Sequence, residues 1–271
     1  MNTPVKLGAF ALAAAVVFGA AFGIGKLAGP IAAAVPDEHG EMETHQQAGL
    51  PGGLLVTDQG YTLETVEAGS GTMAFRIQGP DGHPVTRFDT VHDKPMHLIV
   101  VRRDLSGFRH LHPTLDADGT WRVATDPLGP GVWRAYADFT PTAGPALKLG
   151  TDVAVPGDFR PRPLPQAEST AAVDGYTVTV NGHLEAGNAS TVTFTVRRGE
   201  KLVTDLEPYL GSIGHLVALR QHDLAYLHVH PESGAYTVEV PAAGTYRLFL
   251  DFKHAGTVRT AAFTLNAGGH S

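Results

Sequence analysis

The chain of 271 residues contains no cysteine. This absence excludes disulfide bonds, thiolate nucleophiles and thiolate metal ligands, so a metal site would have to use histidine, carboxylate or methionine side chains. Positive charge is also scarce, because 20 lysine and arginine residues face 27 acidic ones and the formal net charge is −7. Nucleic-acid binding needs a basic surface that neutralises phosphates, and we therefore exclude nucleic acid as a partner.

Motifs of common enzyme classes are missing as well. The sequence has no G-x-S-x-G nucleophile elbow, no H-E-x-x-H motif and no glycine-rich phosphate loop. Hydrolase and nucleotide chemistry are therefore without support. Histidine, by contrast, is plentiful, with 14 residues. The histidines are the feature that a function has to explain.

The N-terminal segment is apolar. Residues 7–25 carry no charge between Lys6 and Lys26, and a helix of this length just spans a hydrocarbon core of ~30 Å. We predict that residues 1–30 are an uncleaved signal anchor, with a signal peptide cleaved near Ala32–Ala34 as the alternative. Both interpretations place the body outside the cytoplasm, as a single-pass membrane protein or as a secreted protein.

Composition along the chain predicts two domains behind this segment. Residues 31–52 are polar and turn-rich and should form a flexible stalk. Residues 53–156 and 168–267 each have the length of an ordinary domain. Residues 157–167 are rich in proline and should form an extended linker.

An internal repeat supports this division. HLIVVRRDLSGFRHLHP at 97–113 and HLVALRQHDLAYLHVHP at 215–231 have equal length and the same His, His and His-Pro positions. GVWRAYADF at 131–139 matches GTYRLFLDF at 244–252 in its glycine, aromatic, arginine and Asp-Phe positions. The equivalent pairs are His97 with His215, His110 with His228, His112 with His230, and Asp138 with Asp251.

Apolar residues alternate with polar ones within each repeat, as in Met73, Phe75 and Ile77. A period of two predicts strands with one face in a core, and turn signals such as GPDG at 79–82 separate the strands. We therefore predict an all-β protein with two tandem immunoglobulin-like or fibronectin-like β-sandwich domains after an N-terminal apolar helix. A small closed barrel is the alternative, and strand order stays open.

The repeated histidines are spaced for metal binding. Residues two apart on a strand project to the same side with their roots ~6.5 to 7 Å apart, so two imidazoles can close on one ion. The short D-L-S-G-F connection should fold the strand that begins at His97 back beside the H-L-H-P strand, which adds a third imidazole. The predicted ligands are therefore His97, His110 and His112 in the first repeat and His215, His228 and His230 in the second.

Two further side chains could modify these sites. Asp138 and Asp251 would be a fourth ligand, or a partner that orients an imidazole. Met96 precedes His97, but Gly214 takes its place in the second repeat, so a thioether could soften only the first site. Imidazole sites follow the affinity order that peaks at copper, so we predict a copper ion, with zinc as the alternative.

The pattern M/G-H-L-x3-R, D-L, H-x-H-P, then G-x-Y/W-R and D-F resembles that of bacterial cell-envelope proteins associated with copper or heavy-metal resistance. It covers most of residues 53–267. The first-repeat residues that carry it are Met96-His97-Leu98, Arg102, Asp104-Leu105, His110-Leu111-His112-Pro113, Gly131, Trp133-Arg134 and Asp138-Phe139. The resemblance implies metal binding in the cell envelope.

These observations favour a non-enzymatic metal-binding protein of the envelope, acting as a copper carrier, buffer or sensor. One alternative is a tandem β-sandwich interaction module that binds another envelope protein and whose histidines are structural. A second alternative is a cupin-like metalloenzyme, because H-x-H is half of that metal motif. The required carboxylate is Asp116 in the first repeat, but Glu232 comes too early in the second, so this pattern does not repeat.

The topology prediction can be tested by proteolysis of intact cells from which any outer barrier has been removed. Because Lys6 favours the inner side of the membrane, protease added outside should degrade the body and leave the anchor in the membrane fraction. Immunoblotting of both fractions measures this. Recovery of a full-length soluble cytoplasmic protein would contradict the prediction.

Overall fold

Strands, turns and loops make up the described chain. A computed structural model describes residues 50–68, 71–232 and 234–268, and no helix occurs in these ranges. The predicted anchor at 1–30 lies outside them, as does most of the predicted stalk at 31–52. Among the described residues, none forms a helix long and apolar enough to cross a membrane.

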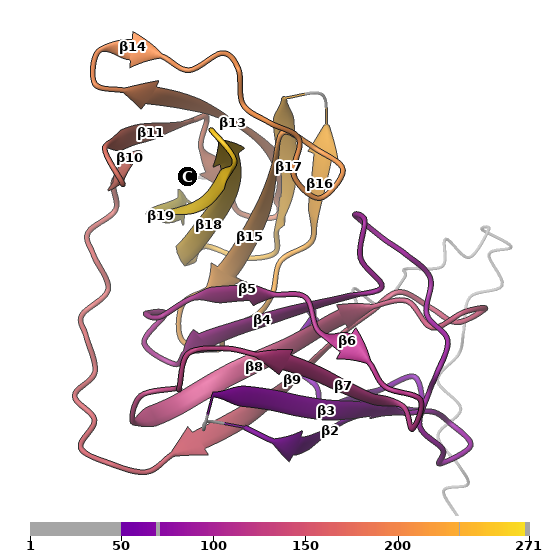
Figure 1. Cartoon of the computed structure of the whole chain (residues 1–271). Coiled ribbons are helices and arrows are strands. Elements are labelled where there is room, and N and C mark those ends of the chain that lie inside the picture. Colours follow the sequence, from indigo (N-terminus) through magenta and orange to yellow (C-terminus); the bar gives the residue numbers. More distant parts are fainter. Residues whose placement is uncertain (1–49, 69–70, 233, 269–271) are drawn as a thin grey trace, which may run out of the picture. The chain divides into compact units, whose positions relative to one another are not determined.

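The first repeat forms two sheets with an apolar core between them (Figure 1). One sheet has the order β1-β2-β3-β7-β6, with β1 at Thr57–Asp58, β2 at Tyr61–Glu67, β3 at Thr72–Gln78, β6 at Thr114–Leu115 and β7 at Thr120–Ala124. The other sheet has the order β5-β4-β8-β9, with β4 at Met96–Arg102, β5 at Arg109–Leu111, β8 at Gly131–Phe139 and β9 at Leu147–Val155. Alternate apolar residues of both sheets, such as Ile77, Leu98 and Trp133, share the core.

The second repeat has the same two-sheet plan. One sheet has the order β10-β11-β13-β17-β16, with β10 at Thr170–Val173, β11 at Tyr176–Asn181, β13 at Asn188–Arg198, β16 at Val229–Glu232, β17 at Ala235–Val240, and β14 at Lys201–Leu202 beside β13. The other has the order β12-β19-β18-β15, with β12 at Leu184–Glu185, β15 at Gly214–Arg220, β18 at Gly244–His254 and β19 at Thr257–Gly268. The prediction of two tandem β-sandwiches is thus confirmed.

Strand registers repeat between the two sandwiches. His97 on β4 lies opposite Asp138 on β8, and His215 on β15 lies opposite Asp251 on β18. The first histidine of each repeat therefore has the predicted aspartate as its cross-strand neighbour. Residues directly opposite on antiparallel strands have Cβ atoms ~4.5 to 5.5 Å apart, so the two side chains start from the same patch of the sheet.

The H-x-H-P segment begins in the same register in both repeats but continues differently. In the first repeat β5 pairs with β4 as predicted, with His110 opposite Ile99. In the second, the Leu227 N–H donates to the carbonyl of Ala218. This is the register in which the equivalent residues Arg109 and Val100 pair in the first repeat. From Val229 onward the chain leaves β15 and pairs with β17 in the opposite sheet. This early change of sheet takes His230 away from β15.

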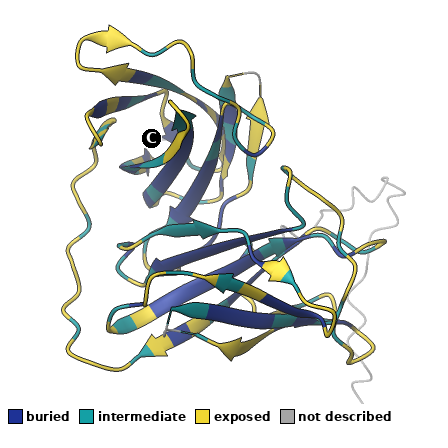
Figure 2. Cartoon of the chain, viewed as in Figure 1, coloured by how far each residue is buried: buried dark blue, intermediate teal, exposed yellow. Residues whose placement is uncertain are grey.

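A third apolar cluster lies between the two sandwiches, which belong to one compact unit. Its buried members are Ile99, Val101, Leu105, Tyr136, Val217, Leu219, Leu224, Tyr226 and Phe249, and we call it the inter-repeat cluster. It explains why β4 and β15 are buried along nearly their whole length (Figure 2). Such strands carry continuous apolar runs instead of alternation, because both of their faces are covered.

Aromatic pairs join the repeats reciprocally in this cluster. Phe108 stacks on Phe249 with ring centroids 4.0 Å apart, and Tyr136 meets Tyr226 edge-on at 5.5 Å. Phe108 and Tyr226 hold equivalent positions in the repeat, as do Tyr136 and Phe249. Each repeat therefore contributes the same two aromatic positions to its contact with the other, which is the pattern of a two-fold-related interface.

Removing one of these rings should destabilise the whole body. Phe249→Ala deletes a buried aromatic side chain, and such truncations cost ~3 to 5 kcal/mol of unfolding free energy. Urea denaturation measures the change. Val258→Ala is the matched control, because Val258 is 39% exposed and its loss should change stability by less than ~0.5 kcal/mol. Equal stability of the two variants would show that the inter-repeat cluster contributes nothing.

Candidate metal centre

Three predicted ligands of the first repeat converge. His97 is on β4, His110 is on β5 and His112 follows β5, and one ring nitrogen from each lies within 4.8 Å of the others. The register explains this, because His110 lies opposite Ile99 and so shares the face of the sheet on which His97 projects. Ring centroids within the group are 4.7 to 5.3 Å apart.

Hydrogen bonds assign the protons on two of these rings. His97 Nε2 lies 3.0 Å from the Val91 carbonyl oxygen, and His97 Nδ1 lies 3.0 Å from His110 Nε2. His110 Nδ1 lies 2.7 Å from an Asp251 carboxylate oxygen. Since a carbonyl and a carboxylate only accept, His97 donates from Nε2 and His110 donates from Nδ1. Asp251 therefore orients the His110 ring by accepting the hydrogen bond from its Nδ1.

The His110–Asp251 pair is buried and comes from both repeats. Each side chain is only 3% exposed, and the Thr260 hydroxyl donates a further hydrogen bond of 2.5 Å to the second oxygen of Asp251. A buried carboxylate is stable only when it is charge-paired and fully hydrogen-bonded. The aspartate that the sequence assigned to the second site thus completes the first.

His112 offers a free nitrogen to the same group. Its Nε2 is buried and has no hydrogen-bond partner among the described residues. Burial is the main cause that lowers the pKa of His112 to about 3, and repulsion from His110 and His97 adds to it. Burial likewise lowers the pKa of His97 to about 4. Both imidazoles are therefore neutral at physiological pH, which is the state that binds a metal.

A fourth imidazole comes from the second repeat. The ring of His215 is parallel to that of His97, with 5.3 Å between centroids and 3° between planes, and it lies 4.7 Å from His110. Burial lowers the pKa of His215 well below its ordinary value. His215 was predicted to belong with His228 and His230, but the structure brings it to the first group instead.

The equivalent aspartate of the first repeat has a different partner. Asp138 forms an ion pair with Lys148, its neighbour on β9, at 3.2 Å. Thr260 takes the place of Lys148 beside Asp251. A two-fold-related copy of the His110–Asp251 pair would join His228 to Asp138. Instead, Lys148 pairs with Asp138, which is one of the differences that make the two halves unequal.

His228 and His230 form a separate, exposed group with Glu239, whose ligand atoms also lie within 4.8 Å of one another. Sequence reasoning missed Glu239, although it lies on the strand that pairs with the H-x-H-P segment. It also missed His92, whose ring is 6.2 Å from that of His97 and 5.7 Å from that of His215. Met96 is fully buried in the core of the first sandwich, on the other face of β4, so its thioether does not serve the site.

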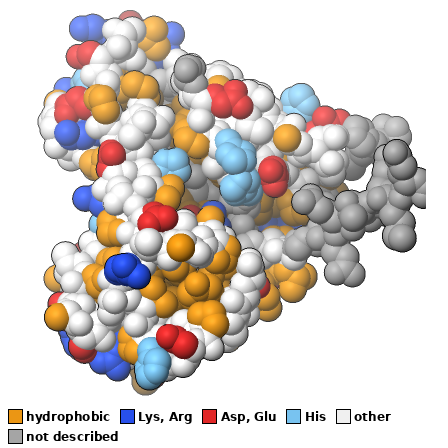
Figure 3. Space-filling view, turned by 90° about the vertical axis from the view of Figure 1, so that its right-hand side faces the viewer, with side chains coloured by type: hydrophobic (Ala, Val, Ile, Leu, Met, Phe, Trp, Pro, Cys, Tyr) orange, Lys and Arg blue, Asp and Glu red, His pale blue; other side chains and the backbone are white. Residues whose placement is uncertain are grey.

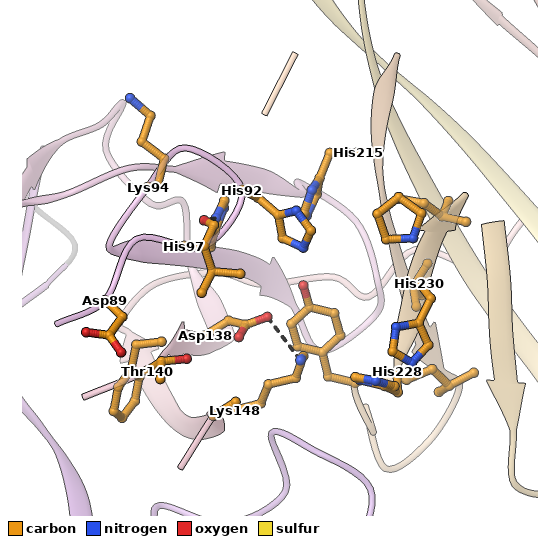
Figure 4. A pocket seen from close by; sticks show the side chains of 18 of the residues that line it. Asp89, His92, Lys94, His97, Asp138, Thr140, Lys148, His215, His228 and His230 are labelled. Atoms are coloured by element: carbon orange, nitrogen blue, oxygen red, sulfur yellow. Dashed lines mark hydrogen bonds and ion pairs between the residues drawn. The ribbon is translucent and has the colours of Figure 1, made fainter. Parts of the chain in front are cut away.

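One cavity is lined by His228 and His230 of the exposed group and reaches the buried group at His97 (Figure 4). Its volume is about 210 Å³, and its lining includes His92, His97 and His215 on one side and His228 and His230 on the other. The Asp138–Lys148 pair also lines it. In the space-filling view of Figure 3, adjoining histidine side chains form one patch near the middle of the face, and others lie singly.

Comparison with known proteins identifies the family to which the chain belongs. The sequence profile described as a domain of unknown function (DUF8832) matches residues 56–160 and again 171–269, which confirms the predicted repeat. No curated protein matches the chain.

The solved structures that resemble the chain at low identity include the following three. The Ig1-2 module of the Drosophila receptor protein tyrosine phosphatase DLAR is 7% identical over 77% of this chain and 99% of that one, with a TM-score of 0.23. The titin domains z1z2 in complex with telethonin are 13% identical over 78% and 96%, with a TM-score of 0.19. The chicken CNTN1 FN1-FN3 domains are 10% identical over 81% and 66%, with a TM-score of 0.22.

The lowered pKa values predict how stability depends on pH in the absence of metal. Below 6.5 the unfolded chain protonates His97 and His112, whereas the folded protein resists protonation down to about 4 and about 3. The unfolded state then binds more protons, so the free energy of unfolding should fall as the pH drops from 6.5 toward 4. Urea denaturation of chelator-treated protein measures it. His112→Gln should make this decline shallower, and an unchanged slope would contradict the assignment.

Proposed function

Since the chain belongs to the family described as a domain of unknown function (DUF8832), its role has to be inferred from its own chemistry, and we propose that it binds one transition-metal ion between its two sandwiches, copper in preference to zinc. One observation carries this proposal. His97 Nδ1 and His110 Nε2 lie 3.0 Å apart, and the other nitrogen of each ring is already held by an acceptor.

This arrangement fits the chemistry of a ligated imidazole. Histidines that bind metals almost always donate their second N–H to a carboxylate or a backbone carbonyl, which fixes the tautomer and the ring. Asp251 does this for His110, and the Val91 carbonyl does it for His97. Two nitrogens bound to one tetrahedral ion at ~2.0 Å lie ~3.3 Å apart, close to the observed 3.0 Å. A metal ion would replace the proton that the two rings share.

His112 would supply the third ligand. Its buried Nε2 has no protein partner in the described chain, and a buried polar atom without a partner costs free energy that a bound ion would recover. Three imidazoles and no thiolate favour copper by the divalent affinity order, with zinc next. Asp251 would stay on Nδ1 of His110 and offset part of the charge of the ion.

His215 would cover this site. A ring nitrogen binds a metal along a direction within its own plane, and the ring of His215 is stacked parallel to that of His97. The two rings are therefore not suited to the same ion. The fourth coordination position is left to water, or to a ligand from a protein that delivers or receives the ion. An open position suits a protein that takes up and releases its ion.

We therefore propose a carrier or buffer of metal ions rather than an enzyme. The apolar segment before residue 30 supports its placement on the outer side of a cell membrane, or its secretion. A second candidate function is an interaction module for another envelope protein. It is favoured by the tandem sandwich architecture and by the His110–Asp251 pair, which joins the repeats without any ion.

Metal titration of the chelator-treated full chain, purified without an affinity tag, separates these functions. Calorimetry with Cu(II) and with Zn(II) should show tight binding at this site, with copper held more tightly. His112→Ala removes a ligand and should weaken tight binding by more than ~100-fold, while Asp251→Asn should weaken it by ~10 to 100-fold. His183→Ala is the matched control, because His183 is exposed and outside both histidine groups.

Equal binding by the wild type and by His112→Ala would show that the buried cluster is structural. The interaction module would then be the better account of the fold. Circular dichroism of each variant shows whether the sandwiches are intact, so a loss of binding can be separated from a loss of folding.

A further inference from the structure

The exposed group of His228, His230 and Glu239 is built by strand pairing and not by chance proximity. Val229 on β16 lies opposite Val238 on β17, and both pack toward the core of the second sandwich. Their neighbours His228 and Glu239 are therefore directed to the outside, and the Glu239 N–H donates to the His228 carbonyl. His230, two residues further along, projects on the same side.

The chemistry of this group is that of a divalent-cation site. Two imidazoles and one carboxylate are a common ligand set for zinc and its neighbours. The rings of His228 and His230 are 4.0 Å apart, and all three residues are exposed. Exposed ligands are solvated and mobile, so an ion would be held more weakly and exchange faster here than between buried imidazoles.

The cavity extends from this group to His97, the member of the buried group that lines it. Its lining contains His228 and His230 together with His97 and His215, and His92 lies against the latter two. Figure 4 shows His92, His97 and His215 on one side of the cavity and His228 and His230 on the other. Two lysines, Lys94 and Lys148, also line the cavity. Lys148 lies opposite Asp138 on the neighbouring strand and is paired with its carboxylate, which reduces the repulsion of a metal ion by this lysine.

We propose that His228, His230 and Glu239 form a surface site that captures a divalent transition-metal ion and passes it through this cavity to the buried site of His97, His110 and His112. This inference rests on the proposed function, because the buried site is the destination. It gives the second H-x-H-P motif a role different from that of the first. A ligand group at the mouth of a cleft raises the local ion concentration and hence the rate of loading.

The test compares stoichiometry and loading rate in the full chain with Cu(II) as the probe. The wild type should bind one tight and one weak ion by calorimetry. His228→Ala with His230→Ala should retain the tight ion at unchanged affinity, lose the weak one, and load about tenfold more slowly in stopped-flow quenching of tyrosine fluorescence. Glu239→Gln should show a smaller slowing, and His183→Ala should behave as wild type.

The outcomes distinguish failure of this inference from failure of the proposed function. A double variant that loads at the wild-type rate overturns the relay, whether or not the buried site binds. A wild type with a single ion that disappears in the double variant overturns the buried site, because the surface group would then be the binding site. His112→Ala should keep the weak ion alone, and loss of both ions in that variant would also contradict two separate sites.

Discussion

The buried ion pair between His110 and Asp251 is the contact on which the arrangement of the site depends. The two residues come from different sandwiches and are 141 positions apart in the chain. Removing one member of a buried pair costs ~3 to 5 kcal/mol, because the other charge stays behind without a partner. The pair therefore disfavours any arrangement of the repeats that separates its two members. The same contact holds the imidazole in the orientation that leaves its second nitrogen facing His97.

Docking the repeats face to face has a further physical consequence. A histidine at an exposed sheet face would be solvated and would titrate near its ordinary pKa. Covering that face with the inter-repeat cluster removes water, and burial lowers the pKa of His97 and His215. The apolar contact between the sandwiches thus favours the neutral form of the His97 and His215 imidazoles. Asp251, the partner of His110, supplies a carboxylate beside them.

Duplication created two equivalent sets of side chains, and a few substitutions made them unequal. Lys148 pairs with Asp138, whereas Thr260 leaves Asp251 available for His110. Lys148 supplies a permanent cation beside Asp138, whereas Asp251 has the His110 ring as its partner. His97, His110 and His112 accordingly form a buried cluster with Asp251 and His215 beside it, whereas His228 and His230 form an exposed group with Glu239.

The sequence by itself determined the all-β class, the repeat and the convergence of His97, His110 and His112, because period-two alternation and hairpin register are local properties. Only the tertiary structure decided that Asp251 and His215 serve the first repeat's cluster. That choice depends on which sheet faces pack together, and such packing joins residues far apart in the chain through contacts that leave no spacing signal in either repeat.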